Sequence, residues 1–318
     1  MWYGKRSALT LLAGLLLGGT PSAVLAAPDG FDANGQCVGD ADGDGQVTID
    51  EIIIAVNNAL ESCEYMPVSL QFRAMVGEQP FECGMQYAGI GTTAADLIPS
   101  DFRFYVHNVR LVTIDGKEMP LRLDQDGIWQ RDDIALLDFE NRVRPCNNGT
   151  TPTNTTLRGG VPPGQYNGVR FVLSVPFSRN HQDQAVAPSP LNLTSMFWSW
   201  QDGYKFLRID TAFDNLRLHV GSTGCEYGPG SPRQIAGCAR PNRAEIRLDD
   251  FDPATNMIVA DLAAVLADSD LNANQPDTPP GCMSDPGDAD CAPMFRNLGI
   301  NFTDGSATPA TQKFFRVE

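Results

Sequence analysis

The chain has 318 residues and a formal net charge of −16 at pH 7. Such an acidic surface argues against binding to nucleic acid or to an anionic membrane. It suits cation binding or a basic partner, although acidity is also a common means of keeping a protein soluble.

The first 26 residues have the pattern of a secretory signal peptide. A basic start, MWYGKR, precedes the apolar run SALTLLAGLLLGG, and TPSAVLAAP ends in the small residues that a signal peptidase accepts. Cleavage is expected after Ala26. This run is too short for a stable span, and no later stretch approaches the roughly 20 apolar residues that a spanning helix needs. The sequence therefore predicts an exported protein without membrane insertion, either periplasmic, secreted or at the cell surface.

Residues 27–66 are expected to form a small calcium module. The segment DADGDGQVTIDE, residues 40–51, matches an EF-hand-type loop, in which closely spaced oxygens repel one another unless a cation lies among them. The expected calcium ligands are Asp40, Asp42, Asp44, Gln46, Thr48 and Glu51. A helix is predicted to follow the loop, but the residues before it, Cys37, Val38 and Gly39, are not expected to form an entering helix. The module therefore resembles one loop–helix half of a dockerin repeat. An Asp- and Gly-rich surface turn is the alternative.

Eight cysteines in an exported chain indicate disulfide bonds. Two pairs are close in sequence and are expected to form local bridges, and a third would bracket the calcium module. The expected pairs are Cys225–Cys238, Cys282–Cys291, Cys37–Cys63 and, from the two that remain, Cys83–Cys146. A thiolate metal site is the competing interpretation, but the sequence contains no C-x-x-C motif.

Residues 67–318 are expected to form a mainly β domain, because short apolar runs alternate with Gly, Pro and Asn turns. In FRFYVHNVRLV a period of two predicts a strand with one buried face. Seven such runs indicate a sandwich or a distorted barrel with long loops. The segment MIVADLAAVLADSDL is expected to be helical, and NANQPDTPPGCMSDPGDADCAP is expected to be loop. The strand-like runs are VSLQFRAMV, FRFYVHNVRLVTI, IALLDFE, GVRFVLSVPF, YKFLRIDTAF, LRLHVGS and RAEIRLDDF.

The sequence lacks the motifs of common enzymes: there is no H-E-x-x-H, no G-x-S-x-G, no P-loop and no GxGxxG after a strand. The protein is therefore expected not to be an enzyme. What remains for chemistry is a small set of histidines and tryptophans. The histidines are His107, His181 and His219.

Several separate blocks of the chain, in order, resemble a known family. They are DFRFYVHNVRLV, LLDFE followed by Cys146 and NNGT, VPPGQYNGVRFVLSVPF, NHQD, PLN, MFWSWQDGYKFLRID, HVGSTGC and PNRAEIRL. Together they resemble the MbnP-like four-Cys proteins, also called metallo-mystery-pair proteins, which include relatives of the copper-repressible proteins MopE and CorA. The resemblance runs from about residue 67 to the C-terminus and does not include the calcium module.

This resemblance implies an exported, β-rich protein that binds copper for acquisition or homeostasis. In the characterised relatives, two histidines hold the metal beside a tryptophan that is oxidised to kynurenine. The gene neighbour is typically a di-haem cytochrome c peroxidase of the MauG type, which is thus the expected partner. Carried over to this chain, His107 and His181 are the expected copper ligands.

Four further residues are candidates for a third donor or for the modified residue. Some relatives have their modified tryptophan near the position of Tyr105, so the tyrosine departs from their pattern. The neighbouring Phe197 and Phe206 favour a buried strand pair around the tryptophans. His219 is also interpretable as a structural residue. The candidates are Tyr105, Trp198, Trp200 and His219.

Two functions from other classes remain open. One is a calcium-stabilised surface or adhesion module without a transition metal. The other is a protein substrate or electron-transfer partner of the peroxidase, in which the tryptophans matter and the metal is secondary. The corresponding non-functional interpretations are a hydrogen-bonded strand residue for His107 and a capped loop for His181, which Asn180 and Asp183 flank.

Overall fold

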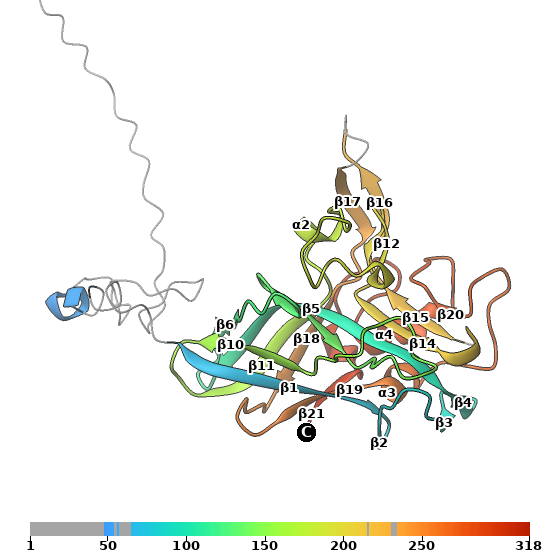
Figure 1. Cartoon of the computed structure of the whole chain (residues 1–318), viewed down its shortest axis with the longest axis horizontal. Helices are drawn as coiled ribbons and strands as arrows, with labels where there is room; N and C mark the ends of the chain where they lie inside the picture. The colour runs from blue at the N-terminus through green and yellow to red at the C-terminus, as the bar shows by residue number, and fades with distance from the viewer. Residues whose placement is uncertain (1–47, 54–55, 57–64, 215, 230–233) are drawn as a thin grey trace, which may run out of the picture. The chain divides into compact units, whose positions relative to one another are not determined.

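The computed structural model describes most of the β domain and a short part of the N-terminal region (Figure 1). The chain divides into two compact units, Met1–Asn57 and Asn58–Glu318. The signal peptide, four of the six expected calcium ligands, Cys37 and Cys63 lie outside the described residues. The described residues are 48–53, 56, 65–214, 216–229 and 234–318.

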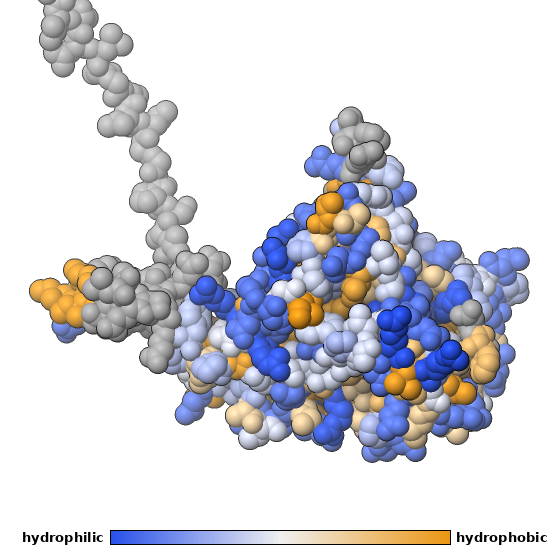
Figure 2. Space-filling view, in the orientation of Figure 1, coloured by the Kyte–Doolittle hydropathy of each residue, from blue (hydrophilic) through white to orange (hydrophobic). Residues whose placement is uncertain are grey.

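In the first unit, residues 49–53 are helical, as expected after the loop pattern. Thr48 and Glu51 form a capping box at its start. The Thr48 N–H and hydroxyl donate to Oε2 of Glu51 at 2.7 and 2.8 Å, and the Glu51 N–H donates to Oγ1 of Thr48 at 3.3 Å. The apolar side chains of this helix are 49–76% exposed and show as orange atoms in Figure 2. They are Ile49, Ile52, Ile53 and Val56.

The second unit contains a six-stranded sheet in the order β21–β19–β1–β10–β7, with β2 paired to β1. Strand β19 runs parallel to β1, and the other pairs are antiparallel. The strands are β1 (Met66–Val76), β2 (Gln79–Pro80), β7 (Arg122–Leu123), β10 (Thr156–Val161), β19 (Met257–Asp261) and β21 (Phe315–Val317).

A nine-stranded sheet is organised around one long strand, β5, which pairs with β6, β9, β11 and β14. Its main path is β18–β11–β5–β14–β15–β20, and β8 pairs with β9. The strands are β5 (Pro99–Thr113), β6 (Glu118–Pro120), β8 (Gln130–Arg131), β9 (Ile134–Asp138), β11 (Tyr166–Leu173), β14 (Leu207–Thr211), β15 (Arg217–Val220), β18 (Ala244–Asp249) and β20 (Gly281–Cys282).

Three short hairpins and several helical segments complete the second unit. The hairpins are β3 (Tyr87–Ile90) with β4 (Ala95–Leu97), β12 (Phe197–Ser199) with β13 (Gly203–Tyr204), and β16 (Thr223–Tyr227) with β17 (Ile235–Arg240). The helical segments are α2 (Phe177–Asn180), η1 (Thr194–Met196), η2 (Ala212–Asp214), α3 (Leu262–Leu266), α4 (Cys291–Leu298) and η3 (Pro309–Thr311). No helix among the described residues is long and apolar enough to cross a membrane.

The two large sheets pack face to face over a phenylalanine core. Phe72 of β1 contacts Phe104 of β5 and Phe171 of β11, with ring centroids 6.1 and 5.9 Å apart. Phe315 of β21 contacts the same two rings of the opposite sheet at 5.4 and 5.1 Å. Of the two predicted architectures, the structure therefore has the sandwich, built from two open sheets.

The prediction of a single buried face for β5 is wrong. Residues from Pro99 to Val106 are all buried, because the second sheet covers one face and a long loop covers the other. The period of two is interrupted at Asn108, which is exposed and has a φ of 50°. Between Arg170 and Val172 the register with β11 shifts by one residue, so β5 contains a bulge directly after His107.

The prediction for residues 257–271 is only partly correct. Met257–Asp261 is strand β19, which lies between β1 and β21, and the helix α3 begins only at Leu262. A short apolar run that is buried in a parallel pair lacks polar alternation, so it resembles a buried helix. The segment 272–293, predicted as loop, contains β20 and the first residues of α4.

We predict that Phe104→Ala lowers the free energy of unfolding by about 3–5 kcal/mol, because it leaves a cavity between the two sheets. Phe104 is 0% exposed. Phe213→Ala is the matched control, since Phe213 is 85% exposed and its loss should change stability by less than about 0.5 kcal/mol. Urea unfolding measures both, and equal effects of the two variants would contradict the assignment of the core.

Candidate functional site

The segment 176–206 covers the outer face of β5 and carries His181, Trp198 and Trp200, which are three of the six candidate residues. Tyr105 of β5 is completely buried beneath it, and its hydroxyl donates to the Pro190 carbonyl at 2.8 Å. The ring of Tyr105 packs edge-on against Tyr204 of β13, whose hydroxyl donates to the Leu191 carbonyl at 2.6 Å. The Tyr105 hydroxyl and the contact between the two rings therefore fix this segment onto the sheet, whereas the Tyr204 hydroxyl joins two parts of the segment itself.

His107 lies on β5 between Val172 of β11 and Ile134 of β9. Its Nε2 is 3.0 Å from the Ser174 hydroxyl, and its Nδ1 is 3.8 Å from a carboxylate oxygen of Asp133. The interaction with His107 lowers the pKa of Asp133, so the carboxylate is ionised and only accepts protons in hydrogen bonds. This favours a proton on Nδ1 and leaves the lone pair of Nε2 facing the hydroxyl.

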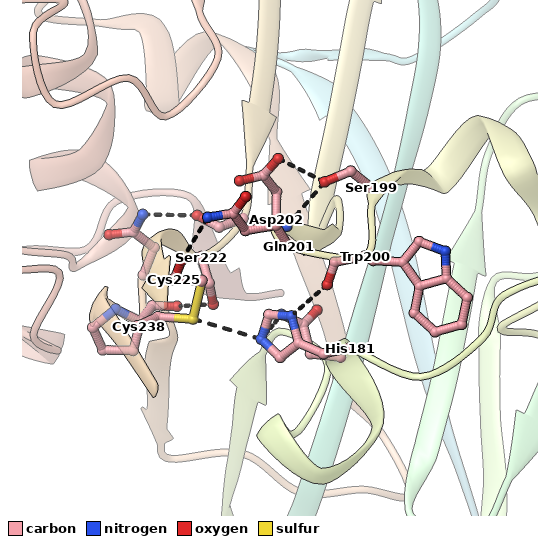
Figure 3. The surroundings of a disulfide bond; sticks show 12 residues. His181, Ser199, Trp200, Gln201, Asp202, Ser222, Cys225 and Cys238 are labelled. Carbon is pink, nitrogen blue, oxygen red and sulfur yellow. Dashed lines mark hydrogen bonds between the residues drawn. A yellow bond between two sulfur atoms is a disulfide. The ribbon is translucent and has the colours of Figure 1, made fainter. Parts of the chain in front are cut away.

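His181 follows the last residue of α2, and Figure 3 shows its surroundings. Its Nδ1 is 3.3 Å from the Trp200 carbonyl oxygen, which can only accept a hydrogen bond. The proton is therefore assigned to Nδ1 and the lone pair to Nε2. Nε2 lies 3.1 Å from the Asn180 amide nitrogen and 3.5 Å from Sγ of Cys238. Burial lowers the pKa of His181, which favours the neutral ring.

The buried amide of Asn180 gives independent support for this assignment. Its Oδ1 accepts the Tyr204 N–H at 2.9 Å, so its NH₂ group is the one that faces His181. The backbone at Gly203 makes room for this amide: φ is +78°, and a Cβ there would lie 2.4 Å from Nδ2 of Asn180. Gly203 thus positions Asn180, and Asn180 donates to Nε2 of His181.

His219 lies on β15 at one end of a buried chain of charges. Arg103 and Asp101 form a bidentate pair, Arg208 contacts Asp101 and Asp210, and Nε2 of His219 is 2.5 Å from Oδ1 of Asp210. Burial raises the pKa of Asp210, but hydrogen bonds and charges from His219 and Arg208 outweigh this and hold it well below its ordinary value. Nδ1 of His219 is buried and has no hydrogen-bond partner among the described residues.

The tryptophans do not form the buried strand pair that was predicted. Trp200 is 41% exposed, and Trp198 is half-buried with its ring 6.4 Å from that of His219. Strand β12 ends at Ser199, so the two indoles lie in different environments. Trp198 packs over Gly221, where a Cβ would come within 2.4 Å of its ring.

Three of the four expected disulfides lie in the described residues and are present. They are Cys83–Cys146, Cys225–Cys238 and Cys282–Cys291. Such bonds are typical of proteins from oxidising compartments outside the cytosol. Two of them lie near further potential metal ligands, with all donor atoms within 4.8 Å of one another. One cluster is His181 with Cys225 and Cys238, and the other is Glu140 with Cys83 and Cys146.

The structure brings together some of the expected site residues and separates others. Trp200 contacts His181 through its carbonyl, and Trp198 contacts His219 through its ring. Among the described residues, His107 and His181 share no partner in hydrogen bonds, ion pairs or ring contacts. Sequence analysis missed the groups that orient the three imidazoles: Asp133, the Trp200 carbonyl and Asp210.

The comparisons with known proteins point to one family. The sequence profile of the MbnP family matches residues 65–284. Among solved structures, the chain is similar to MbnP from Methylosinus trichosporium, at 30% sequence identity and a TM-score of 0.70. That similarity covers 80% of this chain and 98% of the other. A comparison with curated proteins gave no match.

We predict that Asp210→Asn lowers the free energy of unfolding by about 1–3 kcal/mol at pH 7, because a buried charge partner is lost. A carboxyl whose pKa is lowered by folding stabilises the protein above its unfolded pKa of about 3.9, and this contribution is lost as the pH falls further. The difference in the free energy of unfolding between variant and wild type should therefore become smaller below about pH 4. Urea unfolding at pH 7, 4 and 3, with chelator present, measures it.

Asp249→Asn is the control for this measurement. Asp249 pairs with Arg170 at the surface, where its side chain is 76% exposed, so its loss should cost less than about 1 kcal/mol. A difference for Asp210→Asn that stays constant from pH 7 to pH 3 would contradict the lowered pKa of Asp210.

Proposed function

The chain belongs to the MbnP family, and from this premise we propose that it is an exported copper-binding protein that acquires or buffers copper. The proposed ligands are the imidazoles of His107 and His181. His219 is a further donor in the same domain. The acidic charge of the chain favours the approach of a cation.

The observation that supports copper binding best is the shared arrangement of the three histidines. Each has one ring nitrogen that faces an oxygen acceptor: the Asp133 carboxylate, the Trp200 carbonyl or the Asp210 carboxylate. The other nitrogen is then left with its lone pair. Histidines that hold metals typically donate their second N–H to a carboxylate or a backbone carbonyl in this way.

The donor chemistry fits copper. Neutral imidazole nitrogen is a good ligand for both oxidation states, and Cu(I) accepts two or three ligands. The available donor nitrogens are Nε2 of His107, Nε2 of His181 and Nδ1 of His219, and the structure does not bring all three within 4.8 Å of one another. In this proposal copper is cargo, and the residues of the chain bind it and release it again when their rings become protonated.

We predict that His107→Ala and His181→Ala each weaken copper binding at least about tenfold at pH 7, because each removes a ligand. The mature wild type should bind one tight equivalent. Affinity should fall as the pH is lowered through about 6, because imidazolium has no lone pair to donate. Titration against a chromophoric copper chelator between pH 5 and 8 measures affinity and stoichiometry together.

His219→Gln tests the third donor in the same titration, and Tyr105→Phe is a control that keeps the buried ring. Two weak equivalents, each lost in only one histidine variant, would show separate sites and not a shared ion. Copper affinity that does not change with pH, or no copper binding by the wild type, would refute histidine ligation.

The di-haem peroxidase remains a proposed partner. Trp200 is the more exposed of the two candidate tryptophans and is therefore the more accessible to a second protein. Intact-mass analysis of the copper-titration samples, before and after incubation with a MauG-type peroxidase, reports on tryptophan oxidation. Trp198→Phe and Trp200→Phe identify the residue that is oxidised.

We also propose calcium binding by residues 40–51, a function of the first unit alone. The supporting observation is the ordered start of the helix, where Glu51 is 5% exposed and its carboxylate accepts hydrogen bonds from Thr48. We predict that Glu51→Gln weakens calcium binding at least about tenfold, because the bidentate ligand is lost. Asp50→Asn, which changes the adjacent exposed residue, should bind as the wild type does. Calorimetric titration measures both, and equal loss in the two variants would favour a general charge effect.

A further inference from the structure

The Cys225–Cys238 disulfide and His181 form a three-donor cluster that the proposed copper site does not use as a whole. The two cysteines are direct partners in the β16–β17 hairpin. Sγ of Cys238 is 3.5 Å from Nε2 of His181, and the three donor atoms lie within 4.8 Å of one another (Figure 3). Three donors at this separation can surround one ion of a soft metal.

The hairpin is tied to the segment that carries His181. Gln201, next to Trp200, donates its amide to the Cys225 carbonyl at 2.8 Å, and the Trp200 carbonyl accepts from His181. These contacts do not depend on the sulfur–sulfur bond. The positions of the two cysteines and the histidine are therefore supported by groups other than the disulfide itself.

The orientation of His181 is also that of a metal ligand. Its Nδ1–H donates to a backbone carbonyl, and its Nε2 lone pair faces the sulfur of Cys238. Among the described residues, the interaction that competes for Nε2 is the hydrogen bond from the Asn180 amide, which is replaced when a cation binds. The partner atom on the sulfur side carries no proton while the disulfide is intact.

We propose that reduction of Cys225–Cys238 converts this cluster into a Cys₂His site for Cu(I). Thiolate sulfur is a softer donor than imidazole and selects Cu(I) over harder cations. The inference rests on the proposed function in one respect, since His181 is a ligand in both. The disulfide state of the hairpin then sets how tightly the protein holds copper.

The reductant is a dithiol protein of the exported compartment. One of its thiolates attacks Sγ of Cys238, which is half-buried, whereas Cys225 is 3% exposed. The Cys225–Cys238 bond breaks, a mixed disulfide forms, and Cys225 leaves as a thiolate. The second thiolate of the reductant then attacks its own mixed-disulfide sulfur and releases Cys238. Two electrons pass to the two cysteines, the reductant becomes a disulfide, and its two protons go to solvent when Cu(I) binds both thiolates.

The experiment compares the mature protein as isolated with the same protein after anaerobic dithiothreitol treatment and removal of the reagent. Cu(I) affinity is measured by competition with bicinchoninate. Reduction should tighten Cu(I) binding at least about tenfold and give a thiolate-to-copper charge-transfer absorption. The affinity of the reduced protein should return to that of the oxidised wild type in Cys225→Ser/Cys238→Ser, and it should fall at least about tenfold in His181→Ala. The reduced protein should keep its Cu(I) affinity in His107→Ala, since the Cys₂His site does not contain His107, although the same variant weakens binding by the oxidised protein.

A second measurement does not depend on variants that fold. Alkylation of the reduced wild type, with and without Cu(I), followed by peptide mapping, should show protection of Cys225 and Cys238 only. Cys282 and Cys291 are 0% exposed and serve as internal references. Protection of other cysteines instead, or a gain that survives in the double serine variant, would overturn the proposal.

The two proposals fail in different ways. If the oxidised protein binds no copper but reduction creates a site, the proposed function fails and the Cys₂His site stands. If the oxidised protein binds copper and reduction leaves the affinity unchanged, only the Cys₂His site is refuted.

Discussion

The burial of β5 on both faces is the constraint on which the rest of the β domain depends. One face packs its phenylalanines against β1 and β21, and the other places Tyr105 under the segment 176–206. A strand without a solvent face needs a cover on each side, so this segment must stay in place for the sheet to be complete. The same cover carries His181 and both candidate tryptophans, and structural and functional demands therefore fall on one stretch of chain.

Charge is buried beside the same covering segment, since Arg103 and Arg208 both contact Ser195. Positive and negative groups alternate there from Arg103 to His219. Each ion in such a chain lowers the desolvation cost of its neighbours, so the chain is stable as a whole and sensitive to the loss of one member. Because Asp210 is held ionised, His219 has a permanent acceptor on one side of its ring. That orients the imidazole without any metal present.

Much of the fold followed from local pattern, and most of the site did not. Alternating runs such as VSLQFRAMV and RAEIRLDDF form strands β1 and β18, as their pattern predicts. The apolar run at Ile258 forms a central strand, although its sequence pattern resembles that of a buried helix. The partners of His107 and His181 come from the turn between β8 and β9 and from the turn at Trp200, which a linear sequence does not place beside them. Asp210 is the partner that the sequence could have placed, because it lies nine residues before His219 in an antiparallel hairpin.

The close approach of Gly203 to Asn180 has a consequence for the divergence of this domain. A side chain at 203 and the amide at 180 cannot occupy the same space, so the two positions are expected to covary among homologues. A lineage that acquires a larger residue at 203 loses the group that donates to Nε2 of His181, and with it one restraint on the imidazole. A substitution at Gly203 is thereby linked, through the Asn180 amide, to the orientation of the His181 ring.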